Sequence, residues 1–395
     1  MLFNFGGLAR ILKKQLFHSK NTPYRLTSKR TRFLIVLMFL FYIPIEISAW
    51  IGFLLDDLFF RGYRRQAVRQ PVFIIGNARS GTTFIHRLMA KDTHNFTTMN
   101  LWEIVFAPSV TQRKVIRGFS SFDRILGDPV RKLVNRWEQN LFGQIENHKI
   151  GLQEPEEDEY LFMHVCSSAV IWTFFPVDEE VEPYFYYDIE VPEKRRQKDM
   201  LFYRQCLQRH IYFHGGNKQF LSKNPIFSGK IQSLKDCFPD AKFIYMARSP
   251  LSVVPSLISY MATGFHLFCQ MEEKYPYREK ILKLIDFYYQ YPSEVFTRYP
   301  TEDYMVVKYD DLVGDPTGTV KDVYSRLQMR LNLDYFNTLK AETSKARQYK
   351  SNHDYSMEDM GLSSQAILSM FSATCQNYQF DPFVADEKEN VVVRV

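Results

Sequence analysis

The stretch PVFIIGNARSGTT, residues 71–83, decides the fold class. Its first six residues form an apolar run that ends at Gly76, which is typical of a strand covered on both faces of a parallel sheet. A helix is predicted to begin near Gly81. A strand, a glycine loop and a helix in this order direct backbone N–H groups toward an anion, and the helix N-terminus adds positive potential. The stretch therefore predicts an anion-binding loop.

The loop departs from the pattern of nucleotide-hydrolysing proteins, which is GxxxxGK[ST]. Thr82 stands where that pattern has its lysine, and Arg79 lies inside the loop. A guanidinium at this point can hold the bridging oxygen of a phosphosulfate and stabilise charge on the leaving phosphate. Thr82 and Thr83 can donate hydroxyl hydrogen bonds. A P-loop kinase, for which Asp310 and Asp311 would imitate a magnesium-binding carboxylate, is disfavoured because the lysine is missing.

Three further apolar runs, residues 219–222, 242–247 and 304–309, predict strands that alternate with helices. The expected fold class is α/β, a three-layer fold like that of P-loop NTPases, with a central, mostly parallel sheet flanked by helices. Residues 115–150 are expected to be helical. The expected domains are residues 1–70, a basic N-terminus with an apolar membrane-associated helical segment, 71–345, the catalytic domain, and 346–395, a segment that closes the nucleotide site.

A second anion motif follows the run 242–247. Arg248 leaves the strand end, where it can clamp a phosphate, and Ser256 lies eight residues on. Together with the loop, this motif resembles the sulfotransferase superfamily, whose members often read P-K/R-S-G-T-T at the loop. The resemblance implies transfer of a sulfuryl group from 3′-phosphoadenylyl sulfate to a hydroxyl or amine, without a metal. It assigns the 5′-phosphosulfate to Arg79, Ser80, Gly81, Thr82 and Thr83.

The same resemblance assigns the donor's 3′-phosphate to Arg248 and Ser256, and it extends to Lys350, which is expected to touch the donor. The segment KNPIF keeps a lysine of the family, Lys223, but has no adjacent histidine. Lys223 is therefore expected to stabilise the transferring group, and a histidine base is disfavoured there. Glu103 is the expected general base, with Asp158 of the acidic run 154–159 as the alternative.

The apolar run 33–55 is long enough to cross a bilayer, and eight basic residues without an acidic one precede it. Three arrangements are open. The run spans once with a cytosolic N-terminus, or two short helices hinge at Pro44 and lie on the cytosolic face of one leaflet, or it is a buried helix. A lumenal active site would make Asn95 a glycan acceptor, which is awkward so close to the loop helix.

Composition excludes several classes. The chain has 395 residues, 46% of them hydrophobic, and a net charge of +6, so neither disorder nor nucleic-acid binding is indicated. The five cysteines show no zinc spacing and are expected to be buried thiols, with one disulfide left open. The acceptor is expected to be a glycan, glycolipid or other lipid hydroxyl. An inactive relative that keeps only the fold is disfavoured, because all the donor-binding residues are present.

Overall fold

The computed structural model describes residues 2–20, 22, 25–142, 151–346 and 357–380. A sheet of five parallel strands lies at its centre, in the order β2-β3-β1-β4-β5. The strands are β1 (Val72–Gly76), β2 (Phe96–Thr97), β3 (Gln219–Lys223), β4 (Lys242–Ala247) and β5 (Tyr304–Lys308). The predicted α/β class is confirmed. The two-residue edge strand β2 was not predicted, since it is too short to show a pattern.

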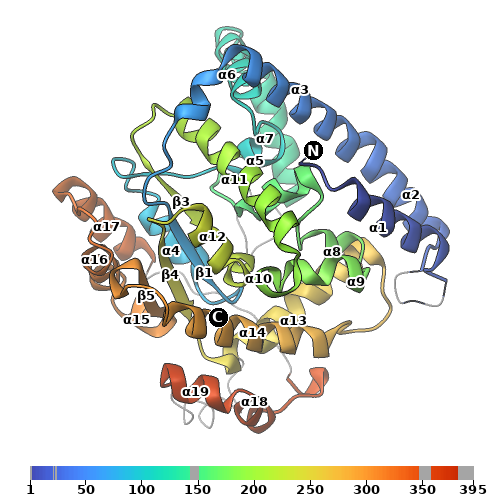
Figure 1. The fold of residues 1–395 in the computed structure, drawn as a ribbon, viewed down its shortest axis with the longest axis vertical. Coiled ribbons are helices and arrows are strands. Elements are labelled where there is room, and N and C mark those ends of the chain that lie inside the picture. Colours follow the sequence, from blue (N-terminus) through green and yellow to red (C-terminus); the bar gives the residue numbers. More distant parts are fainter. Residues whose placement is uncertain (1, 21, 23–24, 143–150, 347–356, 381–395) are drawn as a thin grey trace.

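The side chains of β1 alternate between two cores, which explains why the run is apolar throughout. Val72 and Ile74 pack with helices α4 (Thr82–Met89), α16 (Pro316–Arg326) and α17 (Leu333–Ala346). Phe73 and Ile75 face the larger core on the other side of the sheet. The helices of that side are α11 (Glu193–Phe213), α12 (Ile231–Cys237), α13 (Pro250–Gly264) and α14 (Arg278–Phe296). The fold is thus three layers, with the sheet between helices (Figure 1).

The N-terminal segment forms α1 (Phe5–Phe17) and then one continuous helical run of α2 (Ser28–Val36), η1 (Leu37–Tyr42) and α3 (Ile43–Phe59). The hinge at Pro44 is therefore wrong. The stretch η1 is π-helical, and the Ile43 N–H bonds to the carbonyl of Met38, so the run widens just before the proline instead of breaking there. Figure 1 shows α2 and α3 as one long rod along an edge of the molecule.

The long helical run is docked along one face. Ala49 and Phe53 belong to the larger core, whereas Ile47, Ile51 and Leu54 on the other face are exposed. By length and composition two helical runs are apolar enough to cross a membrane, Ser28–Phe59 and Pro250–Cys269. The second carries Ser256 and is largely a core helix, because Val253, Val254, Leu257 and Ile258 are buried.

The helix predicted at 115–150 is two helices, α6 (Val110–Ile125) and α7 (Pro129–Phe142). Gly127 and Asp128 separate them with positive φ values of 85° and 60°. Residues 143–150 lie outside the described part of the chain.

All five cysteines are free thiols, and four of them are buried. After 346, η8 (Glu358–Met360), α18 (Ser364–Met370) and α19 (Ser372–Tyr378) are described.

The remaining described elements are short. They are α5 (Leu101–Val105), α8 (Ile171–Phe174), α9 (Asp178–Val181), α10 (Tyr187–Glu190), α15 (Tyr309–Gly314), η2 (Arg61–Arg65), η3 (Asp158–Val165), η4 (Glu182–Tyr184), η5 (Pro225–Gly229), η6 (Phe265–Cys269) and η7 (Thr301–Asp303).

Candidate active site

The anion loop follows β1 as predicted and needs an unusual backbone. Gly76 and Gly81 have φ values of 137° and 95°, and Arg79, although not a glycine, has a φ of 71°. A residue other than glycine in the left-handed region costs conformational free energy, and such residues often lie at functional sites. The buried hydroxyl of Ser80 has no hydrogen-bond partner in the described part of the chain. A buried hydroxyl in an anion loop is suited to donate a hydrogen bond to an oxygen of an anion.

The two arginines meet in one place. Arg79 Nε donates to Ser256 Oγ at 3.0 Å, and Arg248 Nη1 donates to the carbonyl oxygen of Arg79 at 2.8 Å. The carboxyl end of β4 presents Arg248, and the first turns of α13 present Ser256. Burial lowers the pKa of Arg248, and the nearby charge of Arg79 adds to this. The loop residue and both members of the second motif therefore lie in a single cluster.

Two tyrosines fix the Arg248 side of this cluster. The Arg248 guanidinium lies 4.0 Å from the ring centre of Tyr309, and the Tyr289 hydroxyl donates to the Arg248 carbonyl at 2.5 Å. Tyr378 of α19 in turn donates to the carbonyl of Tyr289 at 3.0 Å. The tyrosine before Asp310 and Asp311 thus stacks on the second arginine, and the C-terminal segment packs behind it.

Lys223 ends β3, beside the carboxyl end of β1. Its ammonium group lies 2.9 Å from Glu157 Oε1 and 3.5 Å from Glu156 Oε1. Burial lowers the pKa of Lys223, but the two carboxylates raise it above its ordinary value overall, so the lysine is cationic. Burial raises the pKa of Glu157 while Lys223 opposes this shift. Glu157 keeps 27% of its side chain exposed, so it can face a substrate.

Tyr260 of α13 lies within electrostatic range of both Lys223 and Arg79. Burial and the charges of Glu157 and Glu156 raise its pKa, and the charges of Lys223 and Arg79 act in the opposite direction. Tyr260 lies one helical turn after Ser256 on α13, so both point from the same face of that helix. The charges of Arg79, Lys223 and Glu157 therefore all act on one tyrosine, which lies on the helix that carries Ser256.

A histidine from another element lies within electrostatic range of Lys223. His86 of α4 is buried, and burial, followed by the positive charge of Lys223, lowers its pKa to about 3. Its Nε2 atom has no hydrogen-bond partner within the described residues. The histidine is therefore neutral at the pH of a cell.

Asp158, the alternative base, faces inward. It is 1% exposed and accepts hydrogen bonds from the hydroxyls of Tyr203 and Ser222 and from the amide of Asn224. Burial raises its pKa to about 6 despite these donors. Its neighbour Glu159 is equally buried against Lys230, at 2.5 Å. These two residues of the acidic run hold the core together, whereas Glu157 faces the lysine.

Glu103 lies in a different cluster. It is 1% exposed, it accepts from the Asn100 N–H at 3.0 Å, and its Oε1 atom lies 2.9 Å from His214 Nε2 and 3.6 Å from Arg113 Nη1. Burial raises its pKa, but Arg113 and the hydrogen bonds outweigh burial and hold it well below the ordinary value. None of the contacts found for Glu103 in the described residues is with Arg79, Lys223 or Ser256.

Glu103, His210 and His214 bring their ligand atoms within 4.8 Å of one another. A divalent ion fits this group poorly, because Arg113 Nη1 already lies 2.9 Å from His210 Nδ1 and Thr97 Oγ1 lies 2.8 Å from His210 Nε2. Lys350 and its surroundings lie outside the described residues, so its expected contact with the donor stays a prediction.

A glycine loop at the end of β1, an arginine inside it and a second arginine and serine after β4 are the arrangement expected of a transferase of the P-loop-like class. The profile of the Sulfotransferase family matches residues 71–332. This span is more than half of the chain, and the chain belongs to the sulfotransferase family. It is a sulfotransferase enzyme, as predicted.

Relatives agree with this. The chain is 25% identical over 287 residues to proteins of Mycobacterium tuberculosis and Mycobacterium bovis named omega-hydroxy-beta-dihydromenaquinone-9 sulfotransferase Stf3, covering 71% of this chain and 69% of theirs. The fold is similar to the crystal structure of sulfotransferase STF1 of M. tuberculosis, with a TM-score of 0.67, 18% identity and 94% of each chain covered. It is also similar to the crystal structure of sulfotransferase STF9 of Mycobacterium avium, with a TM-score of 0.67, 16% identity and a coverage of 84% of this chain and 82% of that chain.

Proposed function

We propose that this sulfotransferase transfers the sulfuryl group of 3′-phosphoadenylyl sulfate to the hydroxyl of a membrane lipid. The observation that carries the donor assignment is the contact chain from Ser256 through Arg79 to Arg248. One anionic nucleotide can bridge this cluster, with its 5′-phosphosulfate on Arg79, Ser80, Gly81, Thr82 and Thr83. Its 3′-phosphate would lie on Arg248 and Ser256, and Lys350 would close the site.

The transfer needs an oxygen nucleophile, a base and charge stabilisation. The acceptor oxygen forms a bond to sulfur while the bond from sulfur to the bridging phosphate oxygen breaks, and the acceptor proton passes to a carboxylate. Arg79 and Lys223 are placed to stabilise the charge on the bridging and sulfuryl oxygens. The leaving group carries its own negative charge, so no metal is required by this scheme.

Glu157 is the base that the geometry favours. It touches Lys223, it is partly exposed, and its pKa lies above that of an ordinary carboxylate, as a base near neutral pH requires. Glu103, the base expected from the sequence, is the second candidate. For Glu103 to act, the acceptor would have to reach its separate cluster with Arg113 and His214.

A lipid acceptor is supported by two independent observations. The relatives in Mycobacterium are named for a hydroxylated dihydromenaquinone, and the helix α2–η1–α3 exposes an apolar face. A glycan or glycolipid is the alternative. A lipid substrate partitions into the bilayer, so an enzyme that works on it gains from lying at that surface.

The docked face of the long helix favours attachment to one leaflet over a single span. Three polar side chains along it bond to the rest of the protein: Arg30 Nη2 donates to the Phe174 carbonyl at 3.0 Å, Glu46 Oε1 lies 2.8 Å from His164 Nδ1, and Arg209 Nε donates to Asp56 Oδ2 at 2.9 Å. A helix held in this way along its length cannot be surrounded by lipid.

We propose that the enzyme lies on the cytosolic face of the membrane. The Asn95 amide is already bonded to Asp92 Oδ2, at 2.7 Å, which suits an unglycosylated side chain.

The donor is tested by calorimetry in EDTA, comparing adenosine 3′,5′-bisphosphate with ADP. Tight binding of the first and at least about tenfold weaker binding of the second is expected, because only the first presents a phosphate to Arg248 and Ser256. Equal binding, or binding that needs magnesium, would favour the kinase alternative.

The acceptor is tested by incubating the enzyme with ³⁵S-labelled donor and a bacterial membrane extract. The label is expected in the organic phase and to be absent with the Arg79→Ala variant. Label found only in a water-soluble glycan fraction would overturn the lipid assignment while leaving the donor assignment intact.

A further inference from the structure

The helical hairpin of α6 and α7 exposes an apolar surface that the transfer reaction does not use. Val115, Phe119, Phe122, Ile125, Val130 and Leu133 are each at least half exposed, and Phe119 and Ile125 are 71% and 80% exposed. Side chains of this size are rarely left exposed together on a soluble protein. Such a surface needs a partner.

The charge around this surface indicates which partner. Between residues 110 and 136, six basic side chains are exposed and both acidic ones, Asp123 and Asp128, are at least partly covered. The exposed basic residues are Lys114, Arg117, Arg124, Arg131, Lys132 and Arg136. Asp123 is used internally, because it accepts from the N–H groups of Val130 and Arg131 at the start of α7. An apolar strip with a basic border complements the surface of a bilayer with anionic lipids.

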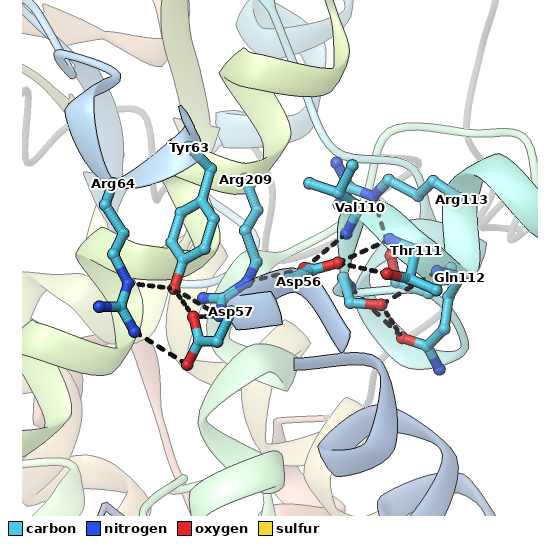
Figure 2. A network of polar contacts seen from close by, with 11 residues as sticks. Asp56, Asp57, Tyr63, Arg64, Val110, Thr111, Gln112, Arg113 and Arg209 are labelled. Atoms are coloured by element: carbon cyan, nitrogen blue, oxygen red, sulfur yellow. Dashed lines mark hydrogen bonds and ion pairs between the residues drawn. The ribbon is translucent and has the colours of Figure 1, made fainter. Parts of the chain in front are cut away.

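The hairpin is fastened to the apolar helix α3. Asp56 near the end of α3 accepts from the N–H groups of Val110 and Thr111, both at 2.8 Å, so it caps the first turn of α6. Arg209 of α11 holds the same carboxylate from the other side, as Figure 2 shows. In Figure 1 the hairpin lies at the same end of the molecule as the end of α3. The hairpin and α3 are thus joined by direct hydrogen bonds.

A small hollow lies beside the hairpin. It has a volume of about 280 Å³ and is lined by Lys114 and Arg117 of α6 and by Tyr212 and Phe213 of α11. The two cations of this lining are suited to the phosphate of a lipid headgroup.

We propose that α6 and α7 form a second membrane-contact element, which together with the exposed face of α2–η1–α3 seats the enzyme flat on a bilayer that contains anionic lipid. The inference rests on the membrane attachment proposed above and deepens it. The aromatic and aliphatic side chains enter the headgroup region, and the basic side chains lie along the lipid phosphates.

The test places an environment-sensitive fluorophore on single cysteines of the full chain that carries Cys375→Ser, since the other four cysteines are buried. The positions are Phe119→Cys in α6, Leu54→Cys in α3 and, as a control, Leu333→Cys in α17, where the native side chain is 72% exposed. Vesicles of phosphatidylcholine with phosphatidylglycerol are expected to shift the emission of the first two labels to the blue and to leave the third unchanged.

The pattern of emission shifts tests the proposed membrane contact of α6 and α7. A shift at Leu54 without one at Phe119 overturns the hairpin inference and leaves membrane attachment standing, and no shift at either overturns both. A shift at Phe119 that grows with protein concentration without vesicles would mean that a second copy covers the hairpin, and it also overturns the inference.

Charge supplies an independent check by vesicle sedimentation. Replacing Arg117, Arg124 and Arg131 with glutamine is expected to weaken binding by on the order of 100-fold, about fivefold for each side chain. The matched control replaces the exposed residues Lys321, Arg326 and Lys340 with glutamine and is expected to bind as the parent does. Equal binding of the two variants contradicts the proposal.

Discussion

Arg248 Nη1 donates a hydrogen bond of 2.8 Å to the main-chain oxygen of Arg79, the non-glycine residue of the anion loop that has a positive φ. The side chain proposed for one phosphate of the donor therefore also supports the loop proposed for the other. The two ends of the proposed nucleotide site are coupled through this one guanidinium, and changes at Arg248 should affect both.

Replacing Arg248 by methionine is expected to weaken the binding of adenosine 3′,5′-bisphosphate by about 10- to 100-fold, because charged hydrogen bonds contribute about 1.5–3 kcal/mol each. Lysine should rescue little, since it cannot donate to a phosphate and to the Arg79 carbonyl in a fixed geometry. Calorimetry measures both variants. Arg326→Met, at an exposed position of α16, is the control. Unchanged affinity in Arg248→Met would contradict the assignment.

Gly81→Ala is expected to abolish measurable donor binding while the chain stays folded. The backbone at Gly81 has a φ of 95°, and an added Cβ would lie 2.6 Å from Tyr309 Cδ2. The loop would have to move away from the tyrosine that stacks on Arg248. Gly314→Ala, where an added Cβ meets no atom within 4 Å, should bind normally. Binding of the nucleotide is measured together with the circular dichroism spectrum, and a variant that binds like the parent would refute the close fit.

Glu157→Gln is expected to lower kcat by about 10²- to 10⁴-fold with little change in donor affinity, because a general base contributes that much. In the parent, kcat/KM should fall as the pH falls through the raised pKa of Glu157, since only the ionised carboxylate accepts a proton. This acid limb should disappear in the variant. Steady-state kinetics from pH 5 to pH 9 measure it.

Glu156→Gln is the matched control for that measurement, since Glu156 contacts the same lysine at the longer distance of 3.5 Å. A folded Glu103→Gln variant that loses turnover while Glu157→Gln keeps it would assign the base to Glu103 instead.

Glu103→Gln is expected to destabilise the fold by about 3–5 kcal/mol at pH 7, because it leaves Arg113 as an uncompensated buried charge. The pKa of Glu103 is lowered by folding, so its contribution is complete above the unfolded pKa of about 4.3 and is lost as the pH falls toward the folded pKa. The stability difference between parent and variant should therefore shrink below about pH 4.3. Urea unfolding at several pH values measures this, and a difference independent of pH would contradict it.

The sequence alone was sufficient for the position of the loop after β1 and for four of the five strands. Strand, loop and helix between residues 71 and 89 depend on local glycine geometry and on a fully apolar run, and both can be seen in the printed residues. The edge strand β2 was not predictable, because two residues carry no periodicity and pair with β3 only when the sheet forms.

The acidic run shows where local pattern fails. Asp158 and Glu157 are neighbours of the same charge, yet one accepts from buried donors of the core and the other faces Lys223 at the rim. Which side chain turns inward depends on the path of the backbone through η3 and on Tyr203, which comes from a distant helix. The local sequence does not distinguish the environments of these two side chains.

The residues by themselves predicted an anion-binding loop that has a threonine at the position of the usual lysine and an arginine inside the loop, because loop geometry is local. Only the tertiary structure decided that Arg79, Ser256 and Arg248 touch, that Glu103 pairs with Arg113, and that the apolar N-terminal helix is docked along one face. The contacts of Arg79 and of the docked helix join residues more than 100 positions apart. Glu103 and Arg113 are close in the sequence but lie on separate helices. These contacts exist only once the helices have packed against the sheet.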